Sequence, residues 1–164
     1  MLPNVETVNL DLRNECMLLR RHILLPALLS GAVMYLISWL WHGLALRDLD
    51  ELSVPMTLYF TLAGVVYMLL GFALTFAVHT ALQHEWISLK HGFPLASGLV
   101  GSIVGFVVYL VIFVLGMSFA KGGMVHVVAD VLWQMFEQAV GGLCVSLGII
   151  YDMHKRYLET ERSH

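Results

Sequence analysis

The stretch HVVADVLWQMFEQAVGG, residues 126–142, places two carboxylates inside the last hydrophobic segment of the chain. Asp130 and Glu137 are seven residues apart. On a helix that turns by about 100° per residue they therefore lie on one face. A charged side chain that faces lipid is costly, and acidic residues within membrane helices usually face the protein interior. The two carboxylates predict a helix with one face turned towards protein or water.

Small and polar residues extend this face in both directions. Within an arc of about 100° it contains His126, Asp130, Trp133, Gln134, Glu137, Gly141, Cys144 and Gly148. Leucine, valine and isoleucine fill most of the remaining circumference, which suits contact with lipid. With the polar face turned inward, residues 127–151 are long enough to cross a membrane.

Composition assigns the whole chain to the membrane class, because 59% of its 164 residues are hydrophobic and only 13% are charged. About 20 apolar residues cross a bilayer core. The expected spans are 23–46, 56–80, 95–118 and 127–151. The sequence therefore predicts an all-α integral membrane fold, a four-helix bundle over residues 22–151.

The two ends of the chain are more polar than the region between them. Residues 1–21 show apolar positions at helical spacing with charges between them, which predicts a short amphipathic helix on the inner membrane surface or against a partner. Residues 152–164 are expected to form a polar cytoplasmic tail.

Basic residues give the expected orientation. Seven fall on one side of the predicted spans: Arg13, Arg20, Arg21, Lys90, Lys155, Arg156 and Arg162. Only Arg47 and Lys121 fall on the other side. Both termini are therefore predicted to be cytoplasmic, in the inner membrane of a bacterial-type cell.

Small residues at four-residue spacing predict close helix packing. Ser97, Gly101 and Gly105 form such a ladder in the third span, and Gly141 and Gly142 contribute to the fourth. The ladders fit packing within one bundle. They also fit contact with a second copy or with another membrane protein.

Polar side chains are expected at two depths. Tyr35, Tyr67, Tyr109 and Glu137 fall near the midpoints of the four spans, where phenol hydroxyls can donate to a buried carboxylate. The alternative is that the tyrosines face different ways and only fill gaps.

A second layer is expected about 10 Å nearer the outer surface, at 1.5 Å per residue. It would contain His42, Asp130 and Gln134. Histidine next to aspartate can carry protons, although histidines at helix ends are often simply hydrated.

Known catalytic and cofactor patterns are not visible in the sequence. There is no Ser/His/Asp set, no glycine-rich phosphate loop and no helical metal-ligand spacing, so no catalytic residue, metal or cofactor is expected. The mild net charge of −3 gives no reason to expect nucleic-acid binding.

Three functions remain open at this stage. The first is a non-enzymatic accessory or structural membrane subunit with a buried polar network around Glu137. The second is small-solute or proton-coupled transport through an outward-facing acidic vestibule. The third is a cofactor-bearing electron-transfer or enzyme subunit. The expected partners are the lipid bilayer and either a second copy or another membrane protein.

Overall fold

A computed structural model describes residues 5–45, 55–89, 92–114 and 124–162. These residues contain helices and no strand. The helices are α1 (Val5–Trp39), the π-helix η1 (Leu40–Ala45), α2 (Met56–Gln83), α3 (Phe93–Val114) and α4 (Met124–Arg162). The all-helical class is therefore confirmed for the described part of the chain.

Three segments are long and apolar enough to cross a membrane: His22–Gly43, Met56–Gln83 and Phe93–Val114. The helix α4 is not among them. Its apolar sequence is interrupted by the side chains of the polar face, including Asp130 and Glu137. Its place in a membrane depends on whether that face is covered by the other helices.

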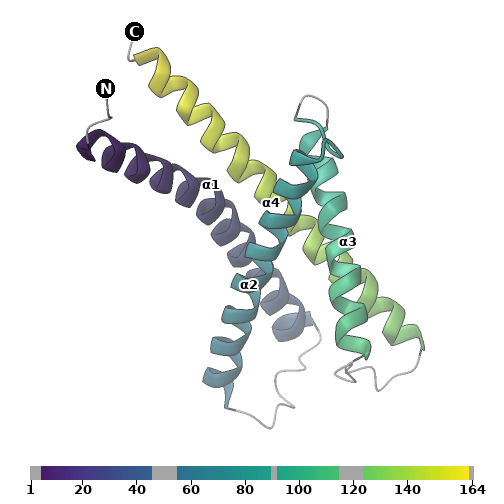
Figure 1. Ribbon diagram of the computed structural model, residues 1–164. Helices are drawn as coiled ribbons and strands as arrows, with labels where there is room; N and C mark the ends of the chain where they lie inside the picture. Colours follow the sequence, from purple (N-terminus) through teal and green to yellow (C-terminus); the bar gives the residue numbers. More distant parts are fainter. Residues whose placement is uncertain (1–4, 46–54, 90–91, 115–123, 163–164) are drawn as a thin grey trace.

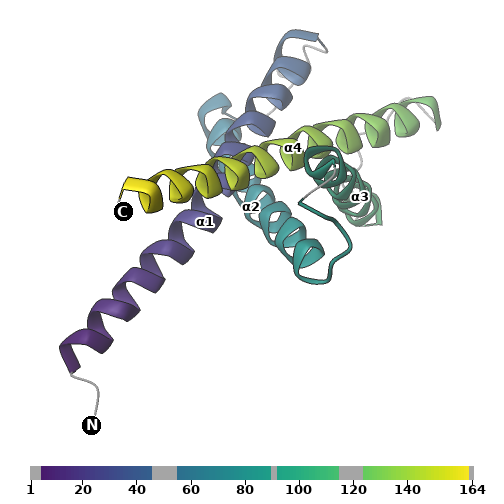
Figure 2. The ribbon, with the colours of Figure 1, turned by 90° about the horizontal axis from the view of Figure 1, so that it is seen from above.

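The helices run up and down between two ends of one bundle (Figure 1). The start of α1, the end of α4 and the connection between α2 and α3 lie at one end, called here the terminal end. The π-helix η1, the start of α2, the end of α3 and the start of α4 lie at the other, called the loop end. Seen from above, α1 and α4 cross at a wide angle (Figure 2). The most extensive packing is between α3 and α4, and α1 packs on both α2 and α4.

Glycines allow these helices to approach at backbone distance. A Cβ atom at Gly101 would collide with the carbonyl oxygen of Gln138, and one at Gly142 would collide with that of Ser97. Gly71 of α2 lies in the same way against the backbone of Ala27 in α1. Close backbone approach at small residues is a main source of helix association within membranes.

The apolar core lies between Glu137 and the terminal end. It contains Met34 of α1, Leu74 and Val78 of α2, and Val145 and Ile149 of α4, all buried. Most large apolar side chains on the outer surfaces of α2 and α3 are exposed. This distribution suits helices that are surrounded by lipid.

Two helices are longer than the sequence led us to expect. The helix α1 is continuous from Val5 to Trp39, where a separate amphipathic helix and a span were expected, and Pro26 lies within it without ending it. The helix α4 continues to Arg162, where a polar tail was expected. Leu, Met, Arg and Glu, which occur in both extensions, favour helix. The side chains of residues 1–21, and the span ends expected at 46 and 118, lie outside the described residues.

Candidate functional site

Glu137 lies at the centre of the bundle, on the face of α4 that packs against α1 and α2. Its side chain is 1% exposed. The hydroxyl of Tyr67 in α2 donates a hydrogen bond to its carboxyl group, and the indole of Trp133, one turn earlier on α4, lies close to it. Within the described part of the chain, its Oε1 atom has no hydrogen-bond partner. The carboxyl group is thus hydrogen-bonded mainly to α2, and its Oε1 atom can accept a further hydrogen bond.

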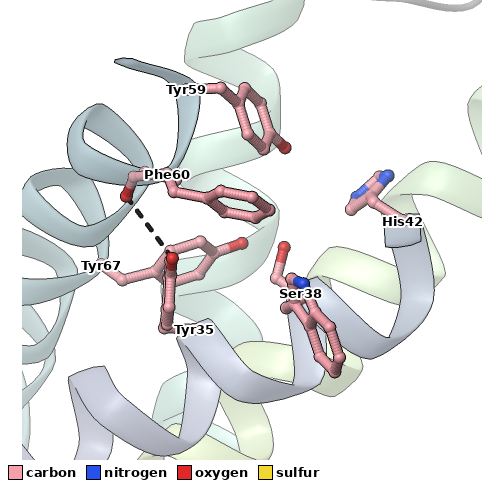
Figure 3. A pocket seen from close by; sticks show the side chains of 8 residues that line it. Tyr35, Ser38, His42, Tyr59, Phe60 and Tyr67 are labelled. Atoms are coloured by element: carbon pink, nitrogen blue, oxygen red, sulfur yellow. Dashed lines mark hydrogen bonds between the residues drawn. The ribbon is translucent and has the colours of Figure 1, made fainter. Parts of the chain in front are cut away.

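Tyr67 also connects Glu137 to α1. Its hydroxyl also lies close to that of the buried Ser38. Figure 3 shows the two hydroxyl groups pointing towards each other. Ser38, Tyr67 and Glu137 therefore form a short series of neighbouring polar side chains across three helices, called here the polar chain.

A recess between α1, η1 and α2 opens next to the polar chain. Its lining residues are Tyr35, Ser38, Trp39, His42, Tyr59, Phe60, Ala63 and Tyr67 (Figure 3). It encloses about 10 Å³, which is the space of roughly one water molecule. Because Ser38 and Tyr67 belong to this lining, the polar chain runs from the recess to the buried carboxyl.

Aromatic rings hold the helices together around the carboxyl. Trp41 of η1 stacks on Trp133 of α4, with ring centroids 4.0 Å apart and an interplanar angle of 13°. Tyr35 and Tyr67 meet edge to face at 5.9 Å. A π-helix shifts the angular positions of side chains around the helix axis. Both Trp41 and His42 lie in the π-helix η1.

Of the three tyrosines expected around Glu137, it is Tyr67 that reaches the carboxyl group. The hydroxyl of Tyr35 instead donates to the backbone oxygen of Phe60, at a long 3.5 Å. Tyr109 of α3 is buried, and its hydroxyl has no partner in the part of the chain that the structure describes. Its ring stacks on Phe113.

The three residues expected nearer the outer surface, His42, Asp130 and Gln134, lie in two different parts of the bundle. His42 lines the recess. Asp130 and Gln134 are half-buried on α4 and do not contribute to that lining. The backbone of Gln134 lies against Gly105 in the interface between α3 and α4.

The residues expected in helix packing lie at helix interfaces. Ser97 faces Gly142, and Gly101 faces the backbone of Gln138. Gly141 lies one turn beyond Glu137, where a Cβ atom would meet the side chains of Met34, Leu74 and Ser30. It therefore allows α1 and α2 to approach α4 one turn from the carboxyl, on the side of the terminal end.

Two buried polar groups were missed in the sequence. Gln138 is fully buried between α3 and α4, and its amide has no partner among the described residues. Asp152 is 3% exposed, and its Oδ2 lies 2.7 Å from Nδ1 of His22 in α1. A signal for Asp152 was present, because 15 residues after Glu137 a helix has turned by a net angle of about 60°, so Asp152 continues the polar face.

No group of three or more His, Cys, Asp and Glu side chains that could hold a metal ion occurs in the described residues. Comparisons with models of known protein families, with curated proteins and with solved structures find no match.

Proposed function

We propose that the protein is a four-span protein of a bacterial-type inner membrane and acts there as a non-enzymatic accessory or structural subunit. Three helices have the length and composition of spans. The fourth, α4, carries its carboxyl at position 137 on a face that α1 and α2 cover. The excess of basic residues near the terminal end favours a cytoplasmic location for both termini.

The main support for this proposal is that the buried polar side chains connect the helices to one another. Tyr67 donates a hydrogen bond to Glu137 and lies next to Ser38, so these groups connect α4, α2 and α1. The adjoining recess holds about one water molecule. Towards the terminal end the bundle centre is filled by Met34 and Leu74, both fully buried. The polar groups thus fix helix positions.

Both long helices extend past the membrane region at the terminal end. Counted from His22, the first part of α1 reaches back to Val5, and α4 runs on from Asp152 to Arg162. At 1.5 Å per residue these extensions measure about 25 and 15 Å. They diverge from each other (Figures 1 and 2). Two helical arms on a membrane anchor are a suitable frame for a second protein, or for a second copy of the chain.

A size measurement tests the structural role. We expect the full chain, extracted from its native membranes in a mild detergent, to migrate on a native gel as a complex larger than the chain alone. Removal of residues 1–21 or 153–164 should reduce that size while the helical content of the bundle persists. A control with Leu62→Ala, on the exposed surface of α2, should leave the complex intact. Migration of the full chain as a single copy would contradict the proposal.

A second candidate function, proton-coupled transport, is favoured by the link between the recess and Glu137. Hydroxyl groups in a hydrogen-bonded chain can pass protons, and an intramembrane carboxyl is a usual proton acceptor in transporters. Glu137→Gln should then abolish proton flux in liposomes while the fold persists, and Ser38→Ala should slow it. Absence of flux in the unaltered protein, across a panel of ions and small solutes, would favour the structural role.

A further inference from the structure

A second hollow lies beside the recess, on the outer surface of the α1 and α2 pair. It is an open groove of about 250 Å³ with a mainly apolar lining of Tyr35, Leu36, Trp39 and Phe60. Tyr35, Trp39 and Phe60 also line the recess. The groove and the recess therefore adjoin each other, and together they are called here the depression.

The recess offers hydrogen bonds without fixed charge. Its polar groups are the hydroxyls of the tyrosines and of Ser38, together with the imidazole of His42, and among the described residues that line it there is no Lys, Arg, Asp or Glu. Such groups suit a neutral hydroxyl or carbonyl oxygen. A phosphate head group would instead call for arginine or lysine. Since the recess holds about one water-sized group, a single neutral oxygen atom fits it.

The groove suits a flat apolar body. The rings of Trp39 and Phe60 provide surfaces on which a planar ring can stack or pack edge to face. Leu36 is 54% exposed, so the groove is open to the surroundings of the bundle. Its volume is slightly below the usual range for small-molecule sites, about 300 to 1,000 Å³, which matches one ring with short substituents.

We propose that this depression binds a neutral, lipid-soluble amphiphile from the bilayer. Its ring lies in the groove, and one ring-borne hydroxyl or carbonyl oxygen enters the recess next to Ser38. The bound oxygen extends the polar chain that ends at Glu137. The proposal rests on the membrane embedding of the protein and is independent of whether the protein is a structural subunit or a transporter.

Photolabelling of the full chain in phosphatidylcholine nanodiscs tests the ligand class. The probe is a benzoquinone with a decyl chain and a diazirine, and the labelled peptides are mapped by mass spectrometry. We expect saturable labelling within residues 35–42 and 59–63. Unlabelled decyl-benzoquinone should compete fully, decanol at least ten-fold less well, and decyl phosphate not at all. Equal competition by all three compounds, or unsaturable labelling spread along α2 and α3, would overturn the proposal.

Substitutions test the position of the site. Leu36→Trp fills the groove from an exposed position and should reduce saturable labelling at least ten-fold. Leu62→Trp is its control, because Leu62 is also exposed but lines neither hollow. Ser38→Ala removes a hydroxyl from the recess and should weaken binding about five-fold, the usual effect of one hydrogen bond. Unchanged labelling of the Leu36→Trp protein would refute binding in this groove.

Discussion

The imidazole Nδ1 of His22 in α1 lies 2.7 Å from Oδ2 of Asp152 in α4. Asp152 is almost fully buried, whereas His22 is about one quarter exposed. Past this pair the two helices continue as the diverging arms (Figure 1). The contact therefore joins α1 to α4 at the base of the arms, on the far side of the apolar core from Glu137.

The first prediction concerns this pair. Asp152→Ala should lower the free energy of unfolding by about 1.5 to 3 kcal/mol, the usual range for a hydrogen bond to a charged group. A double-mutant cycle with His22→Ala should show a coupling energy of about 1 kcal/mol, measured by unfolding in mixed micelles. Additive effects of the two substitutions would show that the contact contributes nothing of its own.

A second ion pair on α4 provides the control. Lys155 Nζ and Glu159 Oε1 are 3.9 Å apart, and their side chains are 42% and 60% exposed. Exposed pairs of this kind contribute little, because water and salt screen the charges. Glu159→Ala should change the unfolding free energy by less than about 0.5 kcal/mol.

The second prediction concerns the hydrogen bond between Tyr67 and Glu137. Tyr67→Phe removes the donor but keeps the ring, and should destabilise the bundle by about 0.6 kcal/mol and by no more than about 1.7 kcal/mol, the average and the maximum for hydrogen bonds between membrane helices. Glu137→Gln keeps an acceptor and should cost less than Glu137→Leu. Tyr35→Phe is the control, since that hydroxyl makes only a long bond to a backbone oxygen. Equal unfolding free energies for all four variants would refute a stabilising polar chain.

The third prediction compares glycines with and without close neighbours. Gly101→Ala and Gly142→Ala each place a methyl group against a backbone carbonyl of the facing helix. Such overpacking typically costs about 1 to 3 kcal/mol. Gly64→Ala in α2 meets nothing within 4 Å, so the better helix propensity of alanine should stabilise it by up to about 1 kcal/mol. A stabilised Gly101→Ala protein would contradict the close packing of α3 on α4.

The sequence predicted the helical class because composition and run length depend on the chain alone. It could not predict which tyrosine meets Glu137. Tyr35, Tyr67 and Tyr109 were expected at one depth, but only the rotation of each helix about its axis decides which ring faces the carboxyl. That rotation is set by contacts such as the one between Gly31 of α1 and the backbone oxygen of Tyr67. A Cβ atom added at Gly31 would lie 2.9 Å from this oxygen.

The ends of the long helices were missed for a different reason. Charged residues before His22 and after Tyr151 indicate the end of a membrane span, but not the end of a helix, because Arg, Lys and Glu are good helix formers. The expected boundary at residue 151 also separated Asp152 from the polar face to which it belongs. A helical-face count continued past the membrane boundary would have included it.

The last prediction concerns topology, and it depends on α4. Three helices are apolar enough to span by themselves, and three spans would place the two termini on opposite sides of the membrane. In the structure the start of α1 and the end of α4 lie at the same end of the bundle (Figure 1). If α4 also spans, with Glu137 covered by its neighbours, both termini share one compartment.

Reporter fusions distinguish the two cases. We expect three reporters to report the cytoplasm: one after His164, one before Met1 and one at Leu89, in the connection between α2 and α3. The reason is that segments rich in Lys and Arg remain on the cytoplasmic side of the membrane. A reporter at Asp50 should report the opposite compartment. Glu137→Gln should not change this pattern, because its neutral side chain is easier to bury in a membrane than a carboxylate. Opposite locations for the fusions before Met1 and after His164 would show that α4 does not cross, and would leave Glu137 without a place inside the membrane.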